Sequence, residues 1–219
     1  HHASSAASDV YKRQLKEKMT DDVWYKALER QMAQNGLLIQ SNRIAALKKI
    51  SSAQENSTTT FPIAELSLSK TNGDSTTDED EFVKALSENR QLDVMAGRTL
   101  IGPHRSDMEA TYKEKGISAK DSSTGEQKAM LISIVLANAR ALKLELGYPP
   151  VILLDEISAH LDIDRRGALY QEINALGAQA WMTGTDKNLF SEFGCKAKYF
   201  HVIESSGISD IKEVDFSVD

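Results

Sequence analysis

The strongest constraint in this sequence is a short apolar run that ends in two acidic residues. Residues 151–154 read Val-Ile-Leu-Leu, and Asp155 and Glu156 follow directly. A strand with one face in water alternates apolar and polar residues, whereas a uniformly apolar strand is typical of a parallel sheet that is covered on both faces. We therefore expect an α/β fold in which this run is a central strand.

The segments around this run alternate between helix and strand. The spacing of apolar residues predicts helices over residues 124–146 and 165–176, and a second strand over residues 180–183. Strands that are joined through a helix usually lie parallel in one sheet. Upstream, residues 108–112 alternate in polarity and a Lys115-Gly116 turn follows, which predicts a short hairpin.

The first half of the chain has a different pattern. Its leader, residues 1–14, is rich in Ser and Ala, reads like a tag or a translated scar, and is left out of the fold prediction. Apolar stripes on either side of Asn35-Gly36 predict two packed helices. After them we expect a polar loop at 54–60, an extended segment over 61–68, a polar acidic linker at about 69–81 and a helix over 82–95.

Composition places the chain among globular proteins and argues against several classes. Of its 219 residues, 41% are hydrophobic, and its one cysteine, Cys195, can form no internal disulfide, which suits a reducing cytosol. The sequence lacks the run of about 18 apolar residues that a membrane helix requires. The net charge of -6 argues mildly against a surface that binds nucleic acid throughout, although small basic clusters occur.

Asp155 and Glu156 form the first candidate site. Ligands of open parallel sheets bind beyond the carboxyl ends of the strands, so both carboxylates would face a substrate crevice. Asp155 is suited to hold Mg²⁺ through water or nucleotide phosphates, and Glu156 is suited to orient or deprotonate an attacking water. The structural alternative is that apolar strands followed by acidic residues also occur in α/β proteins that bind no nucleotide.

The second candidate site is the start of the helix predicted over residues 124–146. Ser123 and Glu126 fit a capping box, in which each side chain bonds the backbone amide of the other residue, and this needs no function. The same geometry also suits an anion. Free backbone amides, the Ser123 hydroxyl and a close-approach glycine at Gly125 would together form a phosphate site.

The order of these elements carries a family resemblance. A Ser-x-Gly-Glu helix start is followed by a long helix, Leu-Leu-Asp-Glu and Ser-Ala-His-Leu-Asp, an order that resembles the signature, Walker B and D-loop motifs of ABC-type ATPases. With Gly-Pro-His-Arg-Ser-Asp at 102–107 and Thr-Gly-Thr-Asp at 183–186, the chain resembles the RecF family from about Asp21 to the C-terminus.

The resemblance implies a fold and a division of the chain. The fold would be the C-terminal half of an ABC- or SMC-type ATPase head, a parallel sheet with flanking helices, preceded by part of a helical arm or lid domain. Residues 15–97 would belong to the arm, and residues 98–219 to the head.

The resemblance also implies roles for individual residues. Asp155 would bind Mg²⁺ and Glu156 would be catalytic. In an ATP-dependent homodimer, the signature of one subunit would contact ATP held by the other subunit; its residues would be Ser123, Gly125, Glu126, Gln127 and Lys128. The D-loop would cross the interface and consist of Ser158, Ala159, His160, Leu161 and Asp162.

On this resemblance the protein would be a bacterial, cytoplasmic recombination mediator with weak DNA-stimulated ATPase activity. It would bind gapped DNA at junctions of single and double strands and promote RecA loading with RecR and RecO. The chain contains no Gly-x-x-x-x-Gly-Lys-[Ser/Thr], so this segment alone is expected not to hydrolyse ATP. The alternatives are another ABC- or SMC-type repair head, or a non-hydrolysing partner-binding module with vestigial motifs.

Two groups of residues keep more than one interpretation. Many ABC ATPases carry a switch histidine where this chain has hydroxyls and a carboxylate. Thr183, Thr185 or Asp186 would substitute for it, and a plain strand-end turn is the alternative. His104 and Arg105 would either face phosphate or DNA, or lie in a purely structural Gly-Pro turn.

Overall fold

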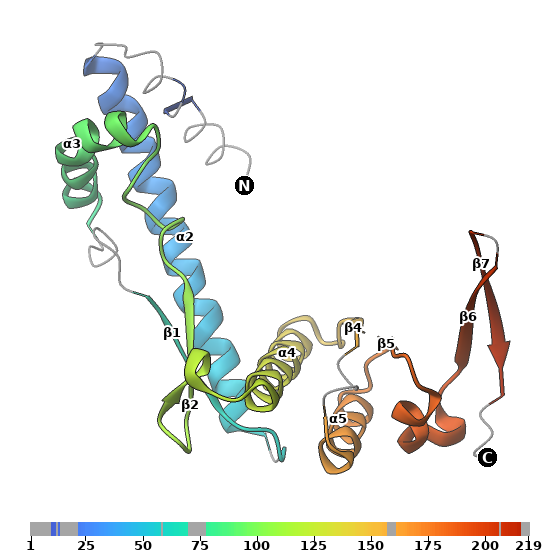
Figure 1. Cartoon of the computed structure of the whole chain (residues 1–219). Coiled ribbons are helices and arrows are strands. Elements are labelled where there is room, and N and C mark those ends of the chain that lie inside the picture. The colour runs from blue at the N-terminus through green and yellow to red at the C-terminus, as the bar shows by residue number, and fades with distance from the viewer. Residues whose placement is uncertain are drawn as a thin grey trace. The chain divides into compact units, whose positions relative to one another are not determined.

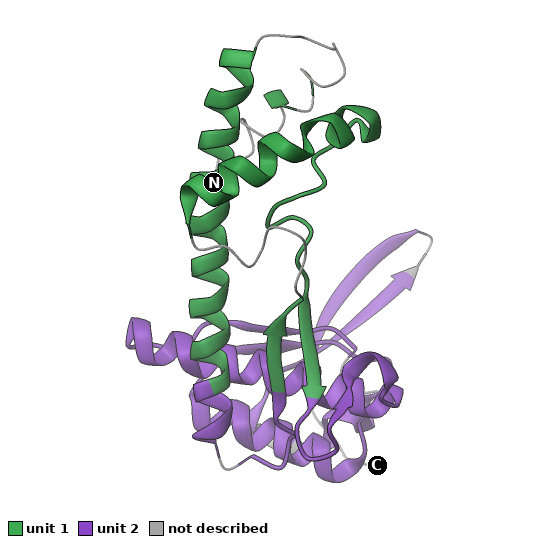
Figure 2. Cartoon of the chain, turned by 90° about the vertical axis from the view of Figure 1, so that its left-hand side faces the viewer, with its two compact units in different colours: residues 1–51, 65–111 green, residues 52–64, 112–219 purple. Residues whose placement is uncertain are grey.

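The structure is a computed structural model, and it describes residues 10–11, 13, 22–57, 59–69, 78–156, 161–205 and 207–215. The chain divides into two compact units (Figure 2). The first comprises residues 1–51 and 65–111, and the second comprises residues 52–64 and 112–219. The assignment of residues 15–97 to an arm and 98–219 to a head stays a prediction.

The N-terminal helical region is one helix, so the prediction of two helices is wrong. Helix α2 runs without interruption over Asp22–Glu55 and passes through Asn35 and Gly36 (Figure 1). A Cβ added at Gly36 would lie 2.7 Å from Cε1 of Phe82. The glycine is therefore needed for close packing of the Phe82 ring and is not a helix break. The helix also includes Gln54, which the sequence pattern placed in a polar loop.

Helix α3, Glu79–Ala96, begins three residues before the predicted start at Phe82 and lies next to α2 in the first unit (Figures 1 and 2). The Asp78 side chain caps it by accepting from the amide of Glu81 at 2.9 Å. Gly97 ends it with a φ of 63°, in the left-handed region that favours glycine. Residues 70–77 of the predicted linker lie outside the described part of the chain.

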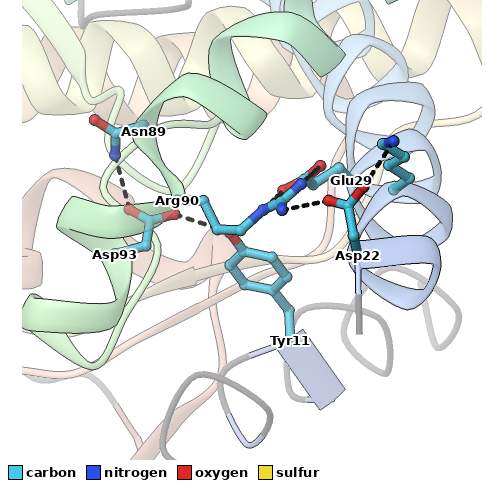
Figure 3. Close-up of polar contacts among 7 residues, drawn as sticks. Tyr11, Asp22, Glu29, Asn89, Arg90 and Asp93 are labelled. Carbon is cyan, nitrogen blue, oxygen red and sulfur yellow. Dashed lines mark hydrogen bonds and ion pairs between the residues drawn. The ribbon is translucent and has the colours of Figure 1, made fainter. Parts of the chain in front are cut away.

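A charged network joins α2 to α3 (Figure 3). Arg90 donates from Nε and Nη2 to the two carboxylate oxygens of Glu29, at 2.7 and 2.9 Å, and from Nη1 to Asp22 at 2.8 Å. Glu29 is fully buried. Because an unpaired buried carboxylate is costly, the bidentate contact with Arg90 is required for α2 and α3 to pack here.

Asp93 is the second buried carboxylate of the first unit. It accepts from Asn89 at 2.8 Å and from the backbone amide of Leu100 at 2.9 Å, and burial raises its pKa. Tyr11 donates to it at 3.3 Å and is itself buried (Figure 3). Tyr11 belongs to the leader left out of the fold prediction; that the leader is non-native stays a prediction.

Three short strands form one sheet in the order β1-β2-β3. They are β1 (Ala64–Leu68), β2 (Met108–Tyr112) and β3 (Ile117–Ser118). The predicted extended segment and the predicted hairpin are both confirmed. Gly116 has a φ of 64° in the turn between β2 and β3, where a glycine is favoured. A one-turn helix, η1 (Ala119–Asp121), leads from β3 to the next helix.

The second unit contains the alternating helices and strands that the sequence predicts. Helix α4 covers Thr124–Leu146, strand β4 Ile152–Leu154, helix α5 Ile163–Leu176 and strand β5 Ala180–Met182 (Figure 1). Strands β4 and β5 pair in parallel, with Leu154 opposite Met182. The core of this unit consists of Phe61, Ala129, Ile132, Leu136, Ala139, Ile152, Leu154, Leu161, Leu169, Tyr170, Ile173 and Leu176.

Strand β4 is covered on one face only among the described residues, so the expectation of a strand buried on both faces is wrong for them. Ile152 and Leu154 are buried in the core, whereas Leu153 between them is 73% exposed. Trp181, the partner of Leu153 on β5, is 54% exposed. The reason is that α4 and α5 supply core residues to one face of this two-stranded sheet.

The C-terminal region forms a 3-10 helical segment and a hairpin. Segment η3 covers Lys187–Lys196, and β6 (Tyr199–Ser205) pairs antiparallel with β7 (Ile208–Val214). The sequence pattern indicated only a mixed tail here. None of the described helices combines the length and apolarity needed to cross a membrane.

Candidate functional site

The acidic end of β4, Asp155 and Glu156, lies next to the end of β5. The parallel pairing brings Thr183 beside it, and the Thr183 amide donates to the Leu154 carbonyl at 3.0 Å. The Thr183 hydroxyl donates to Oδ1 of Asp155 and accepts from the backbone amide of Glu156 at 3.1 Å. One hydroxyl therefore links the side chain of the first acidic residue to the backbone of the second.

Glu156 has an unusual backbone conformation. Its φ is 49°, and it is the one non-glycine residue with a positive φ in the part of the chain that the structure describes. Such conformations are unfavourable for residues with a side chain and persist where surrounding contacts hold them, often at functional sites. Here the contact is Thr183. The side chains of Asp155 and Glu156 are both exposed.

The acidic end can supply part of a metal site. No group of three or more His, Cys, Asp or Glu suited to a metal ion occurs among the described residues. Mg²⁺ usually takes one or two carboxylates together with waters and substrate phosphates. Thr183 contacts Oδ1 of Asp155, and the exposed carboxylate fits a site of that kind, in which the other ligands come from nucleotide and water.

The signature segment, Ser123–Lys128, forms the capping box that the sequence predicts. The Glu126 amide donates to the Ser123 hydroxyl at 3.4 Å, and Oε2 of Glu126 accepts from the Ser123 amide at 2.9 Å and from its hydroxyl at 2.8 Å. The first turn of α4 is therefore fixed by contacts within the chain.

Lys115 adds a contact that the sequence did not reveal. It lies in the turn before β3 and makes an ion pair with Oε1 of Glu126. Hydrogen bonds from Lys115 and then Ser123 lower the pKa of Glu126 to about 2. In the sequence Lys115 reads only as a turn residue. The hairpin brings Lys115 to the start of α4, and no local sequence pattern indicates its ion pair with Glu126.

Gly125 leaves open space over the first turn of α4. A Cβ added there would meet nothing within 4 Å, so no neighbour in the described chain requires the glycine. Glycine inside a helix costs about 0.5–1 kcal/mol relative to alanine. An approaching backbone or phosphate would explain a glycine at this position. Gln127 donates to the Ser122 carbonyl at 3.1 Å, and Lys128 is half-buried.

The predicted D-loop is described only at its end. Ser158, Ala159 and His160 lie outside the described residues. Leu161 is buried in the core of the second unit, and the Asp162 side chain caps α5 by accepting from the Arg165 amide at 2.8 Å. Leu161 therefore contributes to the core and Asp162 to the start of α5. Their predicted role at a dimer interface stays a prediction.

The three switch candidates differ in their contacts. Thr183 is bonded to Asp155 and Glu156, as described above. Asp186 caps η3, since its side chain accepts from the Asn188 amide at 2.9 Å. Thr185 is exposed. Among the candidates, Thr183 is therefore the one that the fold brings to the acidic end.

The loop with His104 and Arg105 belongs to the first unit. The His104 Nε2 atom lies 2.9 Å from the Thr99 carbonyl, and the Arg105 amide donates to the Gly102 carbonyl at 2.9 Å. Arg43 of α2 donates to the Pro103 carbonyl and to the Ser106 hydroxyl. The turn is thus fixed by a backbone bond, by the His104 ring and by Arg43, and residues His104 and Arg105 are both exposed.

Comparison with known proteins identifies the family. No protein-family model matches the chain. The DNA replication and repair protein RecF of Rhizobium meliloti (strain 1021) is 44% identical over 197 residues, which cover 87% of this chain and 53% of that protein. Over these residues the chain belongs to the RecF family. RecF of Agrobacterium fabrum (strain C58) is 43% identical over 197 residues, 87% of this chain and 52% of that protein. The chain spans about half the length of the curated RecF proteins it matches.

Two solved RecF structures share the fold. The recombination mediator protein RecF with ATP, of the RecFOR pathway, has a TM-score of 0.70 at 21% sequence identity and covers 96% of this chain and 57% of its own. The corresponding RecF-ATPrS structure has a TM-score of 0.66 at the same identity, over 95% of this chain and 57% of its own. The predicted fold class, a parallel sheet with flanking helices, is confirmed, because β4 and β5 pair in parallel and the chain shares the fold of these RecF structures.

Proposed function

We propose that this RecF-family chain supplies one acidic end and one signature segment to an ATP-dependent DNA-repair head. The observation that carries the proposal is the link from Asp155 through Thr183 to Glu156. The link joins the Asp155 carboxylate to the Glu156 backbone, and both acidic side chains are exposed at the carboxyl end of a parallel strand, where α/β sheets bind their ligands. The positive φ of Glu156 supports a functional role, because such backbone conformations cluster at functional sites.

The two carboxylates would divide the work on ATP. Asp155 would hold Mg²⁺ together with water and nucleotide phosphates, and the metal would neutralise charge on the phosphates. Glu156 would orient or deprotonate the attacking water. Thr183 would position both groups, because its hydroxyl contacts the carboxylate of Asp155 and the amide of Glu156.

The signature segment would contact ATP held by a second subunit. The open space over Gly125 and the exposed start of α4 suit the approach of a phosphate group from outside the chain. In that complex Ser123 would turn its hydroxyl from Glu126 to the γ-phosphate, and Lys115 would keep the charge of Glu126 neutralised. Gln127 and Lys128 would complete the segment, and Ser158 to Asp162 would cross the dimer interface.

DNA would be the second ligand of the protein. The matched relatives are DNA replication and repair proteins, and the solved neighbour is a recombination mediator of the RecFOR pathway. The exposed His104 and Arg105, on a turn fixed by Arg43, would contact phosphate of gapped DNA. With RecR and RecO, the ATP-bound dimer would promote RecA loading in the bacterial cytoplasm.

Two substitutions test the division of roles in a completed protein, defined as this chain joined to the part of Rhizobium meliloti RecF that it does not match. Glu156→Gln should retain ATP binding, lower hydrolysis about 100-fold or more, and accumulate an ATP-bound dimer. Ser123→Arg should bind ATP as a monomer and fail to dimerise. Size-exclusion chromatography with light scattering, with and without ATP, measures both. If Ser123→Arg dimerised as well as the parent, the signature would have no role across subunits.

A further inference from the structure

Gln54 is a buried polar residue that the proposed function does not use. It lies in the last turn of α2, within the second unit, and only 2% of it is exposed. Its Nε2 donates to the Ala64 carbonyl at 3.0 Å, and its Oε1 accepts from the Ala64 amide at 2.9 Å. Its Oε1 also accepts from the Ser133 hydroxyl of α4 at 3.1 Å.

The Gln54 amide takes the place of a neighbouring strand at the edge of the β1-β2-β3 sheet. Just before β1, the Ile63 carbonyl accepts from the Lys113 amide, on the side of β2. Successive residues of a strand point their amide and carbonyl groups to opposite sides, so those of Ala64 point to the outer edge. Gln54 satisfies both. These contacts determine the orientation of the Gln54 amide. A flipped amide would point its NH2 group at the Ala64 amide and its oxygen at the Ala64 carbonyl.

Ser133 makes this a contact among three elements. A serine inside a helix commonly bonds the carbonyl one turn back, but here the hydroxyl donates to Gln54 instead. Ser133 and Ala64 are both buried, so each lost hydrogen bond would leave a buried polar group unpaired. The end of α2 and the start of β1 are thereby bonded to the helix that begins with the signature segment.

We propose that Gln54 is a positioning residue for the signature segment: through Ser133 it fixes α4 against the end of α2 and the start of β1. The inference rests on the proposed function only for the role of Ser123–Lys128. The other side-chain contacts of α4 with neighbouring elements, those of Glu126 with Lys115, Arg140 with Glu172 and Lys143 with the Leu176 carbonyl, are less buried than the bond from Ser133 to Gln54. The physical reason for the proposal is that apolar packing tolerates small shifts and rotations, whereas a buried hydrogen bond fixes the helix at one height and one rotation. The start of α4 is exposed and depends on that fixed position.

Hydrogen exchange of the full chain tests the bonds themselves. Ser133→Ala removes only the contact with α4, and Ser133→Thr retains a hydroxyl at the same position. We expect amides in the first half of α4 to exchange about fivefold faster in Ser133→Ala, as for the loss of one hydrogen bond of about 1 kcal/mol, and close to the parent rate in Ser133→Thr. Gln54→Met should accelerate both α4 and β1. The control Gln31→Met changes an exposed glutamine on the same helix and should leave α4 unchanged.

Dimerisation of the completed protein tests the consequence. Ser133→Ala should weaken the ATP-dependent dimer about fivefold and leave the nucleotide affinity of the monomer unchanged, and Ser133→Thr should restore the dimer. A general loss of stability would instead weaken both the dimer and the nucleotide affinity of the monomer. Equal exchange in parent and Ser133→Ala, or an unweakened dimer when the parent dimerises, would overturn the inference. If the exchange differs as expected but the parent itself does not dimerise with ATP, the proposed function fails and the bonding of Gln54 to α4 stands.

Discussion

Helix α4 and strand β4 each carry one half of the candidate site, and they are stabilised in opposite ways. At the start of α4, the capping box and Lys115 bond the polar groups of Ser123 and Glu126 to one another within the chain. At the end of β4, Asp155 and Glu156 are exposed and share one short link through Thr183. The polar groups at the start of α4 are therefore paired within the chain, whereas the two carboxylates at the end of β4 are exposed.

The two elements differ in packing as well. Helix α4 buries a series of residues along one side, among them Ile132, Leu136 and Ala139. Strand β4 buries Ile152 and Leu154 and leaves Leu153 exposed between them. A parallel strand normally has cover on both faces. Among the described residues, this chain covers only one face of β4, and we propose that the part of RecF proteins beyond the matched residues covers the other face.

One substitution made in both elements gives the largest expected difference. Leu136→Ala in α4 removes a side chain that is 1% exposed and should lower the free energy of unfolding of the second unit by about 2–5 kcal/mol. Leu153→Ala in β4 removes a side chain that is 73% exposed and should change it by less than about 0.5 kcal/mol. Urea unfolding of the full chain measures both. Equal losses would mean that the outer face of β4 is covered within this chain.

The elements of the second unit could be predicted because local patterns determine them. Residues at both ends mark the helix over Thr124–Leu146: Ser123 forms the capping box, and Gly147 ends the helix with a φ of 82°. The parallel pairing of β4 and β5 follows from their connection through α5. The positions of Asp155 and Glu156 at the strand end follow from the apolar run alone.

The remaining features depend on contacts between distant residues, and sequence patterns do not show these. Gly36 looks like a helix break, and only the Phe82 ring explains why it lies inside α2. The pairing of Lys115 with Glu126 and of Gln54 with Ser133 joins residues on different elements. The exposure of Leu153 could not be predicted from the run Val-Ile-Leu-Leu. An apolar run indicates that both faces of the strand need cover, but it does not show which residues supply that cover.

Thr183 offers the next test, since in the part of the chain that the structure describes its side chain links the two acidic residues. Thr183→Val keeps the shape and removes the hydroxyl, and in the completed protein it should lower ATP hydrolysis about 10- to 100-fold, as expected for loss of a hydrogen bond to a charged group worth about 1.5–3 kcal/mol. Thr183→Ser retains the hydroxyl and should stay within about threefold of the parent. Steady-state hydrolysis at saturating Mg²⁺ and ATP measures the difference. Equal rates for Val and Ser would remove Thr183 from the positioning of the acidic end.

The smallest expected effect concerns pH at the start of α4. The pKa of Glu126 is lowered from 4.5 to about 2 by Lys115 and Ser123. A carboxyl whose pKa is lower in the folded than in the unfolded state stabilises the fold above the unfolded pKa and loses this contribution as pH falls through the folded pKa. The first turn of α4 should therefore loosen between about pH 4.5 and about pH 2. Because Glu126 and Lys115 are accessible to solvent, salt should weaken the effect.

Carboxyl chemical shifts of the full chain, followed by NMR from pH 6 to pH 2 at low salt, would give the titration of Glu126 directly. Lys115→Met removes the first cause of the shift and should move the titration back toward 4.5, whereas Lys113→Met, in the same turn, removes a charge that pairs with Glu55 and should leave it unchanged. If Glu126 titrated near 4.5 in the parent chain, the start of α4 would be no better assembled than the end of β4. The start of α4 would then not differ from the end of β4 in having its charged group paired within the chain.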